Sequence, residues 1–222
     1  MHMPDFLKKE ILTNTENYVR LKLEGEGSGH DWWHIHRVRN AALLIGRIEN
    51  TDLFIVELAA LLHDIADHKF HGGDETIGPM VAGEWLASQN VNEETIDLVK
   101  EIIKDLSFKG VKVKTPMKTI EGQVVQDADR LDAIGAIGIA RAFAYGGHKN
   151  RELHNPNFSP TEHDTFEAYK NDEGSTINHF YEKLFLLKDR MNTKTGKILA
   201  KKRHQFMEEY VERFYSEWNG IE

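Results

Sequence analysis

The sequence contains no cysteine in its 222 residues. Disulfide bonds and thiolate metal ligands are therefore excluded, and any metal ion has to be held by imidazole and carboxylate groups. The chain also lacks a run of about 18 apolar residues, which a membrane-spanning helix would need. Its first residues lack the basic and apolar regions of a signal peptide. These absences predict a cytoplasmic protein with no membrane partner.

An excess of positive charge is missing as well, since the formal net charge is −8 at pH 7. Proteins that bind nucleic-acid polymers normally present a basic face, so we do not expect such a polymer as a partner. A small phosphorylated substrate stays compatible with this charge, because a metal ion or a few lysines and arginines can hold a phosphate inside an acidic protein. Hydrophobic residues make up 40% of the chain, enough for one sizeable globular domain.

The chain shows neither an alternation of strands and helices nor a glycine-rich phosphate loop after a strand. Apolar residues instead recur at intervals of three and four, as at Ile35, Val38 and Ala42, which predicts an all-α fold. The expected helices cover residues 32–48, 53–66, 76–88, 94–106, 117–143 with a bend near Gly135 and Gly138, 176–189 and 195–218. Residues 112–115 are expected to form a loop, because a proline follows them.

Residues 146–175 are polar and rich in turn-forming residues. A loop of this length inside a compact domain is usually functional or mobile, so we interpret it as a flexible flap with a short helix near 164–169. The chain is thus predicted to be one domain over residues 1–222, with a core at 28–145, the flap, and C-terminal helices at 176–218. The pattern is compatible with a homodimer but does not require one.

The adjacent pair His63 and Asp64 lies near the end of the most apolar predicted helix, 53–66. A buried carboxylate is costly unless it is paired or binds a metal. An aspartate at a helix C-terminus also faces the partial negative charge of its own helix. A nearby cation would relieve both costs. The pair is equally consistent with an ordinary helix end, at which the helix dipole favours the histidine.

Two further candidates lie on other predicted helices. His34 lies beside the apolar stripe of 32–48, where a lone histidine is more often a core residue. Asp129 shares a face with Val125 and Asp132, and the alternative there is a solvated acidic surface. With the pair, these residues supply two imidazoles and two carboxylates from three helices. Such mixed ligands suit six-coordinate divalent metals and leave two positions for water or a phosphate oxygen.

The order His34, His63-Asp64 and Asp129 resembles the H…HD…D signature of the HD superfamily of metal-dependent phosphohydrolases. The segments HDWWHIHRV, LLHDIADHKF and QDADRLDAIG are similar to those of small bacterial members of the YedJ/YpgQ type. The similarity covers the core from residue 28 to 145 and extends to the C-terminal run FYEKLFLLKDRMNTKTGKILAKKRHQFM. It implies an enzyme with an HD-type helical bundle and additional C-terminal helices.

The resemblance implies that a divalent metal ion, held by the four residues of the signature, binds a phosphate oxygen and a water molecule together. Mn²⁺ is favoured, and Mg²⁺, Fe²⁺, Co²⁺ or Ni²⁺ would suit the same ligands. No histidine occurs between Gly72 and Gly147, so the extra ligands of two- and three-metal members are missing. We therefore predict one metal ion per chain. This absence and the missing GYP segment argue against a cyclic-di-GMP phosphodiesterase.

Asp67 lies four residues after His63, so on a continuing helix it would share the face of the ligand pair. Related hydrolases often have an acidic residue here, and Asp67 is our candidate for activating or orienting the water. A surface aspartate at the helix end is the alternative. Four cations are candidates for binding the substrate, although a plain salt bridge is an equally good interpretation for each: Arg37, Lys69, Lys109 and Arg130.

Hydrolysis of a nucleotide is the favoured reaction, with a nucleoside triphosphate converted to the monophosphate and pyrophosphate. The alternatives are a nucleoside monophosphate phosphatase, a (p)ppGpp hydrolase and a non-catalytic nucleotide sensor. The (p)ppGpp enzymes carry an HDxxED motif, and residues 63–68 of this chain, HDIADH, depart from it at the last two positions. The complete set of four ligands argues against the sensor.

Overall fold

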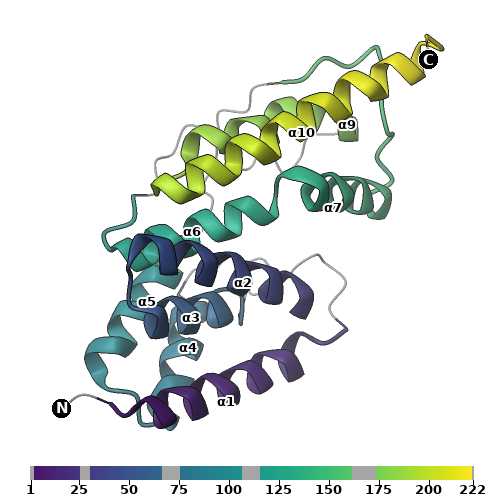
Figure 1. Ribbon diagram of the computed structural model, residues 1–222. Helices are drawn as coiled ribbons and strands as arrows, with labels where there is room; N and C mark the ends of the chain where they lie inside the picture. The colour runs from purple at the N-terminus through teal and green to yellow at the C-terminus, as the bar shows by residue number, and fades with distance from the viewer. Residues whose placement is uncertain (1–2, 26–30, 67–75, 107–115, 162–173, 222) are drawn as a thin grey trace. The chain divides into compact units, whose positions relative to one another are not determined.

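The computed structural model describes residues 3–25, 31–66, 76–106, 116–161 and 174–221. Its contacts divide the chain into two compact units, one of residues 1–108 and 115–128 and the other of residues 109–114 and 129–222. Every regular element in the described ranges is a helix (Figure 1), so the prediction of an all-α fold is confirmed. None of these helices has both the length and the hydropathy needed to cross a bilayer. The single domain over residues 1–222 stays a prediction.

The first unit is built around one helix that is apolar except for Glu57. Its described elements are α1 (Asp5–Leu23), α2 (Trp32–Glu49), α3 (Leu53–Leu62), α4 (Ile77–Ser88), α5 (Glu93–Leu106) and most of α6 (Ile120–Asp132). Nearly all side chains of α3 are buried, and α3 contacts α1, α2 and α5. This central position explains why α3 is apolar apart from Glu57.

Capping residues fix the ends of α2 and α3. Asp31 Oδ1 accepts the backbone N–H of His34 at 2.8 Å, and Asp52 Oδ1 accepts that of Phe54 at 2.9 Å. Asn50 ends α2 with a left-handed φ of 56°, a conformation that asparagine tolerates better than most residues. The short connection after Asn50 lets α3 turn back and pack against α2.

The second unit has an aromatic core. Its described elements are the end of α6, α7 (Gly135–His148), α9 (Thr176–Glu182), the 3-10 helix η2 (Leu184–Arg190) and α10 (Lys194–Trp218). The Phe180 ring on α9 lies 6.1 Å from the Phe143 ring on α7 and 6.1 Å from the Tyr210 ring on α10. These rings therefore join α7, α9 and α10 into one core.

The predicted helix over residues 117–143 is wrong as a single bent helix. The chain forms two helices instead, and α7 begins at Gly135, whose φ is 75°. A side chain would be strained at this angle, and an added Cβ would also lie 2.9 Å from the Cγ of Arg203. Glycine is thus required here by both backbone conformation and packing.

Two other helix boundaries differ from the prediction, and one helix was not predicted at all. The helix predicted over residues 53–66 ends at Leu62, after which residues 63–66 form turns. The helix predicted over 176–189 changes to 3-10 geometry after Lys183. The pattern gave no helix for α1, which buries only Ile11, Thr15 and Val19 and therefore has a weak apolar stripe.

The start of the predicted flap at residues 146–175 belongs to α7, which ends at His148. Residues 149–161 contain no helix. Their backbone is tied to α9, because Glu152 O accepts the N–H of Thr176 at 2.9 Å and Leu153 O accepts that of Ile177 at 3.0 Å. The short helix predicted near 164–169 lies outside the described residues.

Candidate metal centre

His34 occupies the first turn of α2. Its backbone N–H is bound by the Asp31 carboxylate, which fixes the residue at the third position of the helix. The side chain is almost completely buried, with 1% of its surface exposed. A buried imidazole with no apolar role needs polar partners, and the Nε2 atom of His34 faces the Nε2 atom of His63 at 3.2 Å.

His63 forms the C-terminal cap of α3. Its Nδ1 atom lies 2.9 Å from the carbonyl oxygen of Ala60. A carbonyl can only accept, so Nδ1 carries the proton in this contact and Nε2 keeps its lone pair. This is the tautomer that a metal-binding histidine requires, with the second nitrogen oriented by a carbonyl. The sequence places both groups three residues apart on one helix.

Asp64 completes a triangle with the two histidines. Its Oδ2 atom lies 3.4 Å from His34 Nε2 and 3.5 Å from His63 Nε2. Metal–ligand bonds of roughly 2.1 Å separate neighbouring ligand atoms by roughly 3.0 Å at right angles and roughly 3.4 Å at tetrahedral angles. The three atoms are thus spaced as ligands of one metal ion are. Two imidazole nitrogens and a carboxylate also provide the donor set that divalent transition metals prefer.

Asp129 lies on α6 directly after Ala128, and the helix continues unbroken through both residues. One of its carboxylate oxygens, together with one ring nitrogen from each of His34 and His63, belongs to a group of atoms that all lie within 4.8 Å of one another. Asp129 is half-buried. His34, His63 and Asp129 are thus a group that could hold a metal ion, and the complete set of four ligands stays a prediction.

Of the other predicted site residues, three lie outside the described ranges and two are placed by the structure. Asp67, Lys69 and Lys109 lie outside the described residues. The helical spacing used to place Asp67 no longer applies, since α3 ends at Leu62. Arg37 is half-buried on α2, one turn after His34, and Arg130 is half-buried on α6 and donates to the carbonyl oxygen of Arg190.

Two arginines that the sequence pattern assigned no role bind the end of α6. Arg141 Nη1 lies 2.5 Å from Asp132 Oδ2, and the Arg203 guanidinium donates to the carbonyl oxygen of Leu131. Burial lowers the pKa of Arg203, while the nearby Asp132 carboxylate opposes this shift. These contacts bind the last turn of α6, which also contains Asp129. Helical spacing shows the faces of a helix and not its tertiary partners, so the sequence carries no signal for these two contacts.

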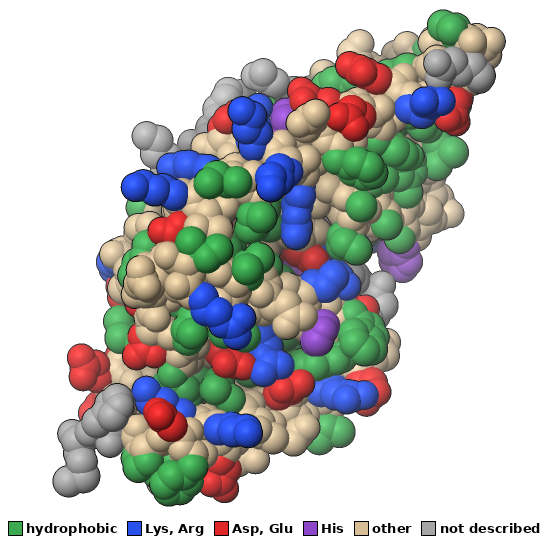
Figure 2. Space-filling model, in the orientation of Figure 1, with side chains coloured by type: hydrophobic (Ala, Val, Ile, Leu, Met, Phe, Trp, Pro, Cys, Tyr) green, Lys and Arg blue, Asp and Glu red, His purple; other side chains and the backbone are tan. Residues whose placement is uncertain are grey.

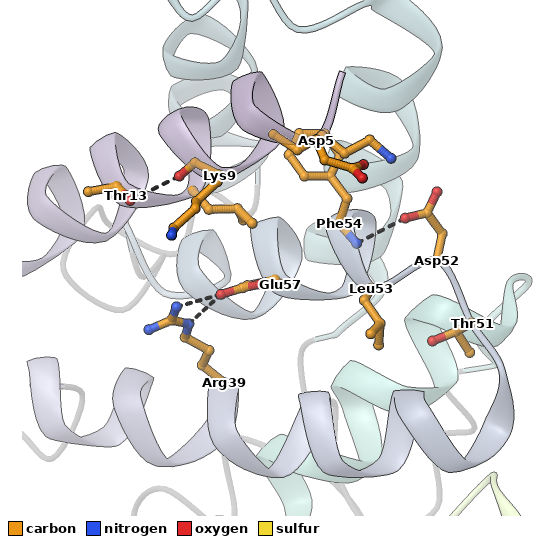
Figure 3. A pocket seen from close by; sticks show the side chains of 11 residues that line it. Asp5, Lys9, Thr13, Arg39, Thr51, Asp52, Leu53, Phe54 and Glu57 are labelled. Carbon is orange, nitrogen blue, oxygen red and sulfur yellow. Dashed lines mark hydrogen bonds and ion pairs between the residues drawn. The ribbon is translucent and has the colours of Figure 1, made fainter. Parts of the chain in front are cut away.

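The first unit also contains a cleft of about 580 Å³ (Figure 3), lined by residues of α1, by Arg39 in the middle of α2, by the connection at residues 51–52 and by the start of α3. Its most prominent cation is already paired: Arg39 lies 2.5 Å from Glu57 and 2.9 Å from Glu16. None of the predicted metal ligands lines this cleft. The metal centre and the cleft are therefore separate features.

A helical protein that gathers buried histidines and carboxylates at one point has the kind of site that metal-dependent hydrolases use. The HD domain family model matches residues 32–134. The protein YpgQ of Bacillus subtilis is 43% identical over 209 residues, which are 92% of each chain. The chain therefore belongs to the HD superfamily of metal-dependent phosphohydrolases, and the predicted family and enzyme class are confirmed.

Solved structures agree with this assignment. An HD-superfamily hydrolase from Bacillus thuringiensis is 43% identical, with a TM-score of 0.76 over 96% of this chain and 98% of that chain. The structure of Bacillus subtilis YpgQ in complex with ADP is 37% identical over the aligned residues, with a TM-score of 0.76 over 95% of this chain and 96% of that chain. The similarity thus extends over nearly the whole fold.

Proposed function

We propose that this protein hydrolyses nucleoside triphosphates to the monophosphate and pyrophosphate, with one divalent metal ion bound by His34, His63, Asp64 and Asp129. The observation that supports a nucleotide substrate is the complex of YpgQ with ADP. The spacing of 3.2 to 3.5 Å among the first three ligand atoms supports a single shared metal ion. Mn²⁺ is the favoured metal, because the ligands mix nitrogen and oxygen.

The bound metal ion would lower the pKa of a water molecule and neutralise charge on the phosphate. The protein's own contribution is to hold the ligands in place before substrate arrives. The Ala60 carbonyl orients the His63 ring, and the Asp31 cap holds the turn that carries His34. Each contact joins residues that are three positions apart in the sequence. His34 and His63 are therefore positioned by the first turn of α2 and the last turn of α3.

Asp67 is proposed to accept a proton from the water or to orient it. Arg37, Lys69, Lys109 and Arg130 are proposed to contact phosphate oxygens. Replacing Asp67 by asparagine should leave Mn²⁺ affinity intact and lower turnover by about 10²- to 10⁴-fold, the usual contribution of a general base. Metal titration together with steady-state kinetics would measure both. Unchanged turnover would remove Asp67 from the mechanism.

The function is tested by incubating the purified protein with Mn²⁺ and a panel of nucleoside tri-, di- and monophosphates and (p)ppGpp, with products separated by chromatography. Release of pyrophosphate from triphosphates is the expected result. Release of inorganic phosphate from monophosphates, or turnover of (p)ppGpp alone, would replace the proposal with those activities. Tight nucleotide binding without turnover in the presence of Mn²⁺, Mg²⁺, Fe²⁺, Co²⁺ or Ni²⁺ would identify a sensor instead.

A further inference from the structure

The two tryptophans at the start of α2 lie in different surroundings. Trp32 is 5% exposed and belongs to the core, whereas Trp33 is 59% exposed. Figure 2 shows hydrophobic and histidine side chains at the surface where α2 begins. Tryptophan is highly buried on average in folded proteins, and Trp33 directly precedes the proposed ligand His34. Core packing therefore explains Trp32 and leaves the exposure of Trp33 to another role.

A neighbouring histidine orients the Trp33 ring. The ring centroids of Trp33 and His36 lie 5.8 Å apart with an angle of 82° between their planes, an edge-to-face arrangement. His36 is held in turn by Asn40, whose Nδ2 atom donates to His36 Nε2 at 3.1 Å. Trp33 thus has a contact that fixes its ring and a large surface still open to solvent. An aromatic group that is ordered before binding loses less conformational entropy when a ligand contacts it.

Arg37 is a helical neighbour of both the exposed ring and the proposed metal ligand. It lies four residues after Trp33 and three after His34, and both spacings bring side chains together on the surface of a helix. The first two turns of α2 thus present a metal ligand, a proposed phosphate contact and an aromatic ring in this order. A nucleotide presents its groups in the same order, from the metal-bound phosphates through the sugar to the base. This surface of α2 therefore matches a nucleotide group by group.

We propose that the indole ring of Trp33 stacks on the base of the nucleotide substrate. This inference rests on the proposed function and adds the part of the substrate that the metal ion does not contact. Every base has a flat aromatic face, so stacking on tryptophan tolerates different bases. The substrate class is therefore nucleoside triphosphates with any base, and inorganic polyphosphates, which lack a base, bind more weakly. A stacked base is remote from the reacting phosphate, so Trp33 contributes to substrate affinity and not to the chemical step.

Two ligands that differ in the base test this stacking. Isothermal titration in the presence of Mn²⁺ measures the affinity for α,β-methylene-ATP, which resists cleavage to pyrophosphate, and for inorganic tripolyphosphate. Trp33→Ala should lower the affinity for the nucleotide analogue by about 5- to 150-fold, the usual loss of one stacked base. Its affinities for tripolyphosphate and for Mn²⁺ alone should stay as in wild type. Trp33→Phe keeps an aromatic face and should recover most of the lost affinity. In turnover of ATP, Trp33→Ala should raise KM and leave kcat unchanged.

The matched control is Ile48→Ala, which removes an apolar side chain that is 58% exposed at the other end of α2 and should change neither affinity. Equal losses for both ligands in Trp33→Ala would show that Trp33 positions His34, and would overturn the stacking. Unchanged affinity for the analogue in Trp33→Ala would also overturn it, as would wild-type protein that binds tripolyphosphate as tightly as the analogue.

The two proposals fail in different ways. Wild-type protein that binds the analogue but releases no pyrophosphate from ATP would contradict the proposed reaction, while a loss of analogue affinity in Trp33→Ala would still support the stacking. Normal release of pyrophosphate by Trp33→Ala, with the KM of wild type, would contradict the stacking alone.

Discussion

The two proposed histidine ligands and the proposed aspartate ligand Asp129 are held by different kinds of contact. The backbone of His34 and the ring of His63 are held by groups three residues before them in the sequence, the Asp31 carboxylate and the Ala60 carbonyl. The end of α6, where Asp129 lies, is bound by Arg141 on α7 and by Arg203 on α10, which donates to Leu131 across 72 positions of the chain. One side of the site is thus built locally and the other depends on tertiary structure.

The largest effect is expected from removing a ligand on the local side. The change His63→Ala should lower Mn²⁺ affinity by more than the roughly 10- to 100-fold loss that outer contacts cause, and turnover should disappear with it. Isothermal titration with Mn²⁺ and the nucleotide assay measure the two effects. His148→Ala, at the exposed end of α7, is the matched control and should keep both properties. Full metal affinity in His63→Ala would remove this residue from the ligand set.

The distant contacts are tested next by Arg141→Ala. The side chain of Asp132 is 5% exposed and that of Arg141 is 28% exposed, so the change removes from a buried carboxylate the guanidinium that forms an ion pair with it. The free energy of unfolding should fall by about 3 kcal/mol, as for other broken buried pairs, and Mn²⁺ affinity should fall by about 10-fold. Denaturant titration and metal titration separate these quantities. A destabilised protein with wild-type metal affinity would show that the end of α6 does not depend on this arginine.

The same contrast explains which features could be predicted from sequence. The amphipathic α2 follows from apolar periodicity. The buried α3 follows from a nearly continuous apolar segment, and the pair His63-Asp64 lies at the end of that segment. The break between α6 and α7 could not be predicted as a break, because it depends on Gly135 meeting the Arg203 side chain from a helix distant in sequence. The role of Arg203 was missed for the same reason. Helical spacing shows which residues share one face of a helix, but it does not show which distant residues that face contacts.

A pH titration tests His179, a histidine outside the proposed ligand set. Burial, reinforced by the positive charges of Lys183 and Arg151, lowers the pKa of His179 in the second unit from 6.5 to about 3. The unfolded chain therefore takes up this proton first as the pH falls. Its contribution to stability is complete above pH 6.5 and is lost progressively toward pH 3, with a loss of roughly 2 kcal/mol at pH 5. Denaturant titrations across this range should show the decline, and His179→Gln should flatten it. An unchanged slope in that variant would assign the decline to other groups.

The smallest expected effect comes from the cap of α2. Asp31→Ala removes the acceptor for the His34 N–H, and loss of a helix cap costs about 1 kcal/mol of unfolding free energy. The turn that carries His34 then frays more often, so Mn²⁺ affinity should fall by at most about 5-fold, the equilibrium factor that corresponds to 1 kcal/mol. Asp31→Asn keeps a cap of similar strength and should behave as wild type in both measurements. If Asp31→Asn lost as much metal affinity as Asp31→Ala, the carboxylate charge would matter more than the cap. The local side of the site would then depend on electrostatics as well as on helix geometry.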